Sequence, residues 1–367
     1  MLKRLVNELR CTVSITTTGP VLVKSGRASV CGPDMTPVET YRNGREEVYL
    51  PGSSLKGVIR SHLEKICRTL RPGVVCNPFV KTADVAQTQN GHLVCPDFAD
   101  VACSDKFEVR EKGELRVGND RWRRQKEGEL SSTTVYADSC PICRLFGSTS
   151  FIGRLSIGDA YLAEGAPRPP LETRDAVGID RLTGGAAHGA KFELQTVPSG
   201  VTFRSDILLR NFECWQVGML LVAIADMRDG LVRVGSGRSR GLGAVKAEVT
   251  ELTFHTLAPT PGRGEGEVWG LGKLLSENKR GIYAVRDEDA LPITPAPPES
   301  TSGLRRVAVF AGNGLPEGAK AQAACAFADL ESKAREVFVA RLDAWQVSPG
   351  MRWPDDWHQQ QGGPAHE

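Results

Sequence analysis

Residues 234–243 read VGSGRSRGLG and place two arginines among four glycines. Guanidinium groups and free backbone N–H groups bind anions, and glycine lets a backbone approach an anion closely. Two common nucleotide loops are excluded, because Arg240 stands where a dinucleotide fingerprint needs its third glycine and Gly241 stands where a P-loop needs lysine. The alternation after residue 244 also predicts a strand, whereas both nucleotide loops precede a helix.

The loop therefore predicts either a site for a different anion or a mobile turn before an edge strand. The residues expected to contact the anion are Gly235, Ser236, Gly237, Arg238, Ser239 and Arg240.

A second anion site is predicted where a helix begins. An apolar stripe at helical spacing indicates a helix over residues 53–71, with Ser53 as its N-cap. Lys56 lies in the first turn, where the helix dipole disfavours a cation, and Gly57 weakens the helix by about 1 kcal/mol relative to alanine. A bound phosphate would explain both features, although single unfavourable residues are common. The candidate ligands are Ser53, Ser54, Lys56 and Arg60.

The sequence CPIC at residues 140–143 has the spacing with which two thiolates bind one metal ion. A structural zinc site needs four ligands, so two more must come from Cys76, His92, Cys95 or Cys103. The set that we favour is Cys95, Cys103, Cys140 and Cys143. A redox pair and ordinary buried thiols are the alternatives.

The 367 residues are 40% hydrophobic and 25% charged with a net charge of +2, so a nucleic-acid surface would have to be local. Charges interrupt the N-terminus, which leaves no signal core. The longest uncharged apolar run, residues 214–225, is shorter than the ~20 residues of a membrane helix. Ten cysteines without a signal favour reduced thiols or metal, so we expect a cytoplasmic protein with no membrane partner.

The periodicities predict an α+β fold. A strand at 11–18, the helix at 53–71, strands near 154–162 and 191–210, a buried helix at 215–227 and a strand after 244 follow the order of a ferredoxin-like unit. Residues 72–143 are expected to form an insertion. The proline-rich stretch 291–303 is expected to be a linker or a loop, and a further helix is predicted at 318–346.

Four segments occur together in the order YLPGSSLKGVIRSHLE, CPICRLFGS, RDAVGIDRLTGGAAHGAKFELQTVPSGVTF and VGSGRSRGLGAVK. Together they resemble the RAMP superfamily of CRISPR-associated proteins, and specifically the backbone ("Cas seven" type) subunits of type III and type IV effector complexes. The resemblance spans about residues 10–253.

The resemblance implies an RRM-like ferredoxin fold (the RAMP core) over residues 1–71 and 144–255, a lid insertion over 72–143 and a C-terminal extension over 256–367. It implies that the protein polymerises as a helical filament along CRISPR guide RNA, beside other effector subunits, and meets complementary target RNA or DNA. A thumb hairpin at about 174–192 would wedge into the guide–target duplex. The residues that lie on it are Arg174, Asp180, Arg181 and His188.

Type III relatives also cut target RNA with a loop aspartate, for which the candidate is Asp34. Such cleavage would require Mg²⁺, because one carboxylate cannot serve both reacting oxygens. A loop aspartate that caps a turn is the alternative. A stand-alone guide-processing endoribonuclease would need a histidine for acid–base chemistry, and only His62 and His188 fall in the matched motifs.

Overall fold

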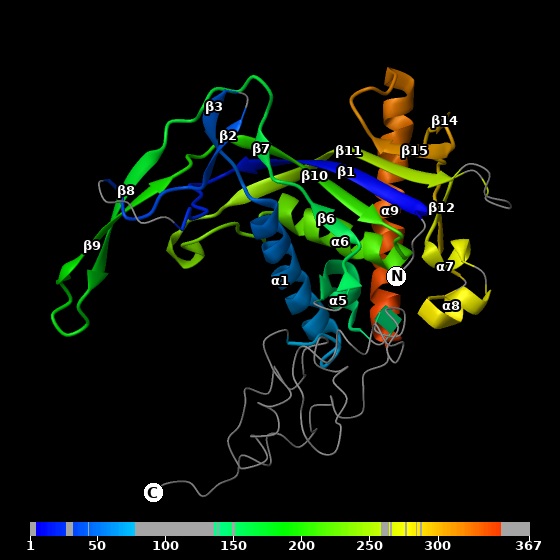
Figure 1. Cartoon of the computed structure of the whole chain (residues 1–367), viewed down its shortest axis with the longest axis horizontal. Coiled ribbons are helices and arrows are strands. Elements are labelled where there is room, and N and C mark those ends of the chain that lie inside the picture. Colours follow the sequence, from blue (N-terminus) through cyan, green and yellow to red (C-terminus); the bar gives the residue numbers. More distant parts are fainter. Residues whose placement is uncertain are drawn as a thin grey trace, which may run out of the picture.

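The computed structural model of the chain is shown in Figure 1. It describes the following residues: 5–26, 32–42, 44–77, 136–137, 139–148, 151–257, 264, 266–275, 277–283, 285–286 and 288–345.

A mostly antiparallel sheet forms the centre of the molecule. Its strands are β1 (Asn7–Thr17), β6 (Leu155–Ile157), β10 (Thr202–Arg210) and β11 (Val245–Leu257), in the order β11-β1-β10-β6. With α1 (Gly52–Leu70) between β1 and β6, and α6 (Cys214–Arg228) between β10 and β11, the connectivity is that of a ferredoxin-like unit. The predicted α+β fold is confirmed.

Both helices lie on the same side of the sheet (Figure 1). β1 alternates, so that Leu9, Cys11, Val13 and Ile15 are buried while Arg10 is exposed. α1 buries most of its predicted stripe, at Leu55, Ile59 and Leu63, although Leu70 is 47% exposed. α6 is buried on nearly all sides, because the sheet covers one face and α9 (Glu317–Asp343) covers another.

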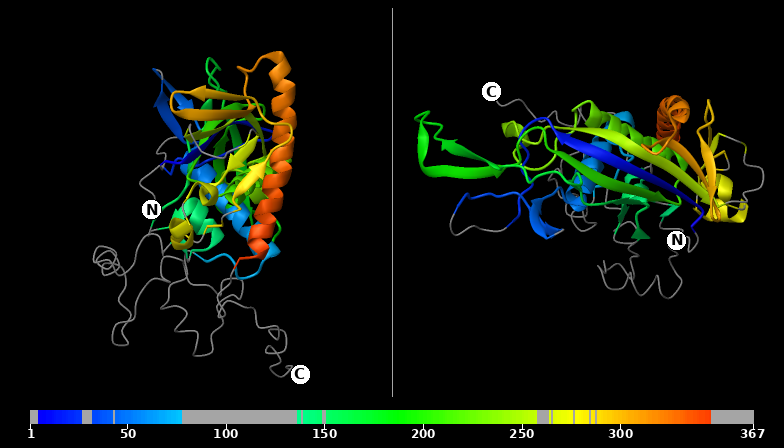
Figure 2. Two further views of the ribbon diagram at one scale, coloured as in Figure 1. Left: turned by 90° about the vertical axis from the view of Figure 1, so that its right-hand side faces the viewer. Right: turned by 90° about the horizontal axis from the view of Figure 1, so that it is seen from above.

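A long hairpin projects away from the sheet, at the left of Figure 1 and of the right-hand view of Figure 2. Its strands are β8 (Glu172–Ile179) and β9 (Ala186–Thr196). The hairpin encloses the predicted thumb, and Leu182 at its turn is 97% exposed. We call this element the thumb hairpin.

The described parts of the insertion are its ends. Residues 78–135 lie outside the described residues, so the predicted lid is visible only at 72–77, 136–137 and 139–143. The short helix α5 (Pro141–Phe146) begins inside it and leads to the small hairpin β4 (Gly147–Ser148) and β5 (Phe151–Ile152).

The C-terminal extension continues the central sheet. β15 (Arg305–Ala311) pairs with β11, and β14 (Glu299–Ser302) pairs with β15. The expected linker or loop at 291–303 is therefore wrong in part, since it contains β14 and the end of β13 (Ala290–Pro292). Pairing with partners far along the chain overrides the proline-rich composition there.

The remaining elements of the extension lie to one side of its long helix (Figure 1). β12 (Glu267–Trp269) pairs with β13, and α7 (Leu271–Leu274) and α8 (Glu277–Tyr283) follow β12. The helix predicted at 318–346 is confirmed as α9. Elsewhere, β2 (Glu39–Arg42) and β3 (Arg45–Val48) form a hairpin before α1, and β7 (Tyr161–Leu162) pairs with β10.

Candidate nucleic-acid interface and cysteine centre

The glycine-rich loop between α6 and β11 has a defined conformation. The backbone N–H of Ser236 donates to Leu22 (2.7 Å), and that of Gly243 donates to Pro20 (2.8 Å). Gly235 has φ +85°, and a Cβ there would lie 2.3 Å from the Leu22 carbonyl oxygen. The loop therefore needs glycine for close backbone packing, and these hydrogen bonds argue against the mobile-turn alternative.

The cations of this loop face solvent. Residues Arg238–Arg240 form a single 3₁₀ turn between Gly237 and Gly241, both left-handed, and all three side chains are exposed. Within the described part of the chain, neither arginine has a carboxylate within ion-pair distance. The guanidinium of Arg240 lies over the Phe192 ring, 5.5 Å from its centre. An exposed and uncompensated pair of guanidinium groups suits a phosphate.

The glycine-rich loop packs against three other segments of the chain. Leu22, Leu194 and Leu242 form a small buried cluster, against which Met35 and Phe192 pack. These residues belong to the segment after β1, the thumb hairpin, the glycine-rich loop and the loop that carries the candidate aspartate. The elements predicted to bind nucleic acid, except the start of α1, therefore pack against one shared hydrophobic cluster.

Asp34 lies at the root of the thumb hairpin. Its Oδ2 accepts a hydrogen bond from the backbone N–H of Glu193 (2.8 Å). The neighbouring Met35 exchanges backbone hydrogen bonds with Glu193 and Gln195, so the loop adds to β9 as a short parallel bridge. The side chain is exposed. This geometry gives Asp34 a structural role, and its predicted catalytic role remains a prediction.

The thumb residues are displayed along the projecting hairpin. Arg174 pairs with Glu172 on its own strand (3.2 Å), whereas Arg181 and His188 are exposed near the turn. Asp180 caps the turn, because its Oδ1 accepts from the N–H groups of Leu182 and Thr183. His62, the other histidine of the matched motifs, pairs with Asp226 between α1 and α6 (2.6 Å).

The start of α1 differs from the prediction in its cap. The helix begins one residue earlier, after Pro51, and no side chain of its own caps it, so the assignment of Ser53 as N-cap is wrong. Asp159 supplies the missing acceptor, since its Oδ1 accepts from the Gly52 N–H (2.7 Å). Ser53 is exposed and Ser54 half-buried, and both hydroxyls lie in the first turn without a capping bond.

A cavity of about 630 Å³ opens beside this first turn. It lies between α1, residues 152–157 and the end of β10, and its lining includes Lys56, Arg154 and Arg210. Burial, and then the neighbouring charge of Arg60, lower the pKa of Lys56. We call this space the α1 cavity. Sequence reasoning missed Arg154 and Arg210, since no local pattern marks either as a site residue.

The side chain of Arg60 contacts the cysteines and does not line the α1 cavity. Its Nε donates to Glu64 (2.9 Å), and its Nη2 donates to Cys143 Sγ (3.8 Å). A guanidinium that hydrogen-bonds a sulfur favours the thiolate form of that sulfur. The predicted role of Arg60 in phosphate binding therefore competes with a role at the cysteine centre.

The cysteine centre consists of Cys76, Cys140 and Cys143, all buried, whose sulfurs lie within 4.8 Å of one another. Cys76 Sγ is 3.6 Å from Cys143 Sγ and 3.7 Å from Cys140 Sγ. These distances exceed the ~2.05 Å of a disulfide but match the ~3.8 Å between thiolates that sit about 2.3 Å from one tetrahedral metal. The cluster could therefore hold a metal ion.

The third sulfur is Cys76, one of the four upstream residues considered above. Cys95, Cys103 and His92 lie outside the described residues, so their part in the site is untested. Cys140 also caps α5, because its Sγ accepts from the Cys143 N–H. This cap fixes the two thiols of the CPIC motif relative to each other.

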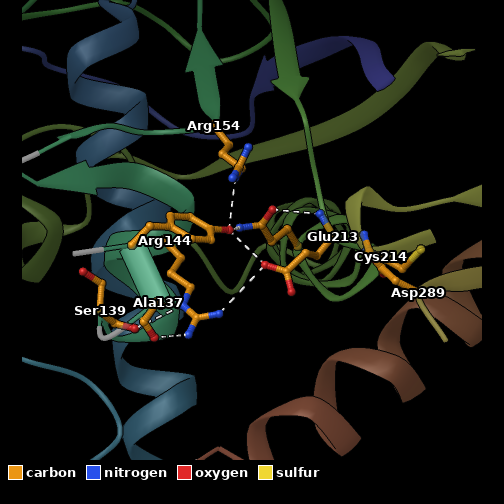
Figure 3. Close-up of polar contacts among 10 residues, drawn as sticks. Ala137, Ser139, Arg144, Arg154, Glu213, Cys214 and Asp289 are labelled. Carbon is orange, nitrogen blue, oxygen red and sulfur yellow. Dashed lines mark hydrogen bonds and ion pairs between the residues drawn. The ribbon is translucent and has the colours of Figure 1, made fainter. Parts of the chain in front are cut away.

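A buried polar network joins the end of the insertion to the core (Figure 3). Tyr136 donates its hydroxyl to Glu213 (2.9 Å) and accepts from Arg154 Nε (3.0 Å). Arg144 of α5 lies 4.0 Å from Glu213 and stacks over the Trp345 ring of the extension. The network ties the insertion, α5, the start of α6 and the extension together.

The ferredoxin-like core, with exposed arginines on a fixed loop at the base of a projecting hairpin, is an arrangement that suits a nucleic-acid-binding protein. Residues 14–246, more than half of the chain, match the family model of the RAMP superfamily, and the chain belongs to that family. Membership indicates a CRISPR-associated, RNA-binding role beside other effector subunits. A comparison with curated proteins found no match. Among the described helices, none is long and apolar enough to cross a membrane.

Proposed function

We propose that this protein is the guide-RNA-binding backbone subunit of a type III or type IV effector complex, and that copies of it polymerise along the guide. The observation that carries the proposal is the position of Arg238 and Arg240. They stand exposed on a rigid loop that packs against the root of the thumb hairpin. A guide held by these arginines would pass directly beside the thumb.

The thumb hairpin fits a role at the guide–target duplex. Its strands extend well away from the sheet, and its turn displays apolar Ile179 and Leu182 beside Arg181. Apolar side chains that enter a base step unstack it, and neighbouring cations hold the displaced backbone. The guide would recognise the target, whether RNA or DNA, by base pairing. The protein would only set the intervals at which the duplex is interrupted.

Several copies of the protein on one guide would bind it more tightly than the two arginines of a single copy can. Two phosphate contacts per subunit give modest affinity, but a row of subunits on one RNA adds these contacts together. The net charge of only +2 is compatible with this arrangement, because the exposed Arg238 and Arg240 form a local cationic surface on the loop.

For the cysteine centre we propose structural zinc. Three buried thiols at metal-ligand spacing are a soft donor set, which favours zinc over hard cations. The metal would hold the two ends of the insertion together, since Cys76 lies near its start and Cys140 lies near its end. Asp34 is held by the backbone N–H of Glu193, and we favour a binding scaffold over a target-cutting enzyme.

The test is reconstitution with a repeat-derived guide RNA. We expect the full chain to bind the guide in several copies, with a copy number that rises with guide length in native mass spectrometry. The double variant Arg238→Ala/Arg240→Ala should lose the multi-copy complexes, while Arg228→Ala, whose partner Glu331 lies on α9, should retain them. A monomer that ignores guide RNA, or a copy number independent of its length, would exclude the proposal.

A further inference from the structure

The cysteine centre lies against α1, and the helix carries three charged residues there at helical spacing. Arg60, Glu64 and Arg68 follow one another every four residues, so their side chains share one face of the helix. Glu64 accepts from Arg60 at one carboxylate oxygen (2.9 Å), and its other oxygen lies 3.7 Å from Arg68. These side chains are between 13% and 26% exposed, so solvent screens their charges weakly.

Both arginines reach the segments that carry the cysteines. Arg60 Nη2 donates to Cys143 Sγ (3.8 Å) on α5. Arg68 Nη2 donates to the backbone carbonyl oxygen of Cys76 (3.2 Å), near the start of the insertion. One helix therefore contacts both ends of the insertion, at a sulfur on one side and at the main chain on the other.

The contact with the sulfur depends on the planar guanidinium of Arg60. Glu64 fixes its Nε while Nη2 points to Cys143, whereas a lysine would have to serve both partners from one nitrogen. The centre of the Phe146 ring on α5 lies 6.0 Å from the guanidinium carbon. The surroundings are thus partly apolar, which strengthens the attraction between the guanidinium and a charged sulfur relative to water.

The charge of a metal-loaded centre explains why a cation lies here. Three thiolates around one divalent ion leave one net negative charge, and a fourth thiolate would leave two. Cys76, Cys140 and Cys143 are all buried, so this charge is unfavourable unless a cation lies beside it. Glu64 offsets the charge of one of the two arginines, which leaves the charge of the other for the centre.

A hydrogen bond to a ligand sulfur also affects the metal that the sulfur binds. Groups that donate to metal ligands orient them and tune the metal, and the loss of such a group typically lowers metal affinity about 10- to 100-fold. Arg60 is placed in this way relative to Cys143, while Arg68 touches only the main chain of Cys76. The two arginines therefore differ in what they can do for a bound metal.

We propose that Arg60 is a positioning residue of the cysteine centre, which orients the Cys143 sulfur and compensates the negative charge of a thiolate-bound soft divalent ion. This inference rests on the metal proposed for the centre and deepens it. It also replaces the predicted phosphate-binding role of Arg60, since Nε and Nη2 have partners within the protein and the side chain does not line the α1 cavity.

The experiment loads the full chain with Zn²⁺ or Co²⁺ and measures metal affinity by chelator competition. In Arg60→Met the affinity should fall about 10- to 100-fold. The thiolate-to-cobalt charge-transfer band should also move to longer wavelength, because a sulfur without its donor and cation holds its electrons less tightly. Arg60→Lys keeps the charge and should recover part of the affinity and of the band position.

Arg68→Met is the matched control, because Arg68 lies on the same helix beside the same Glu64 but donates to a main-chain oxygen. It should leave the cobalt band in place. Equal affinities and band positions in wild type and Arg60→Met, or equal band shifts in Arg60→Met and Arg68→Met, would overturn the inference. If Arg60→Met fails to fold, Arg60→Lys and Arg68→Met decide the matter through the same two measurements.

Guide binding gives an independent readout for Arg60. Arg60→Met should keep the salt dependence of guide binding, whereas a slope reduced by about 0.7 would show that Arg60 contacts a phosphate and would refute its assignment to the centre. A wild type that takes up neither Zn²⁺ nor Co²⁺ would refute the proposed metal and the inference with it. Metal uptake without guide binding would refute the proposed backbone function and leave the role of Arg60 standing.

Discussion

The guanidinium of Arg240 lies 5.5 Å from the centre of the Phe192 ring, so the glycine-rich loop and the thumb hairpin are in direct contact. Phe192 also packs against the buried cluster of Leu22, Leu194 and Leu242. A change at either residue should therefore affect both the charge that meets the guide and the direction in which the thumb points.

The first prediction separates these two effects. Arg240→Ala should reduce the salt dependence of guide binding by about 0.7 in the slope of log K against log salt, because one phosphate contact of a single strand is lost. Phe192→Leu should weaken binding while leaving that slope unchanged, since it removes only the contact that orients Arg240. Fluorescence anisotropy of labelled guide between about 50 and about 200 mM salt measures the slopes. Identical slopes for wild type and Arg240→Ala would place Arg240 away from RNA.

The second prediction concerns the cysteine centre. Freshly purified protein should contain about one zinc per chain, and Cys76→Ser or Cys143→Ser should each lose it and lower the melting temperature. Cys325→Ser is the matched control, because Cys325 is exposed on α9 and far from the cluster in sequence. Elemental analysis and thermal melts report both quantities. A metal-free wild type with an unchanged melt in Cys76→Ser would favour ordinary buried thiols.

The third prediction addresses Asp34. Guide-loaded complexes of wild type and of Asp34→Ala should both leave complementary target RNA intact in magnesium, because the carboxylate is engaged by the backbone of Glu193. The variant should lose about 0.5–1.5 kcal/mol of stability, the usual contribution of one hydrogen bond. Denaturing gels and urea unfolding test the two statements. Periodic cleavage by wild type that disappears in Asp34→Ala would show a cutting enzyme instead.

The fourth prediction follows from Asp289, which accepts hydrogen bonds from Cys214 and Gly272 at the starts of α6 and α7. Burial, and then the charge of Glu213, raise the pKa of Asp289 to about 7. An unfolded aspartate titrates near pH ~3.9, so this group stabilises the fold fully below that pH and loses the contribution as the pH rises through about 7. Wild-type stability should fall across this window.

Asp289→Asn should flatten that fall, because the amide does not titrate. Asp289→Asn should also lower the stability at pH ~5. The N–H groups of Cys214 and Gly272 bind different oxygens of Asp289, and the NH₂ group of asparagine cannot accept either of them. Asp329→Asn is a control of opposite sign: although burial opposes the shift, hydrogen bonds from Lys333 and Thr294 lower the pKa of Asp329. The melting temperature should be measured as a function of pH across this window. If it fell with pH as steeply in Asp289→Asn as in the wild type, Asp289 would not be the titrating group.

Local patterns were sufficient for the regular elements. The stripe through Leu55, Ile59 and Leu63 predicted α1 to within a residue or two, and the uninterrupted apolar run of α6 predicted its burial. Such signals are contained within a few turns, so they need no knowledge of distant partners. The order of the elements then predicted the ferredoxin-like connectivity.

The parts that escaped prediction depend on distant partners. Asp159 replaces Ser53 as the acceptor at the start of α1 from a position 107 residues away. Arg154 becomes a site residue only because Tyr136 and Glu213 fix it. β14 escaped notice because it is short and polar, and it forms only where β15 is already paired with β11. Composition and spacing carry no information about these contacts between residues that are distant in the sequence.

The central position of β1 has a consequence for synthesis of the chain. Glu8 pairs with Arg210 on one side and with His255 on the other, so both neighbours of the first strand are translated about 200 residues or more after it. At a typical ~5–20 residues per second, β1 leaves the ribosome roughly 10–40 s before either partner exists. During that interval both its hydrogen-bonding edges are open to other strands, including those of neighbouring nascent chains. The strand that is made first therefore stays unpaired until β10 and then β11 have been made.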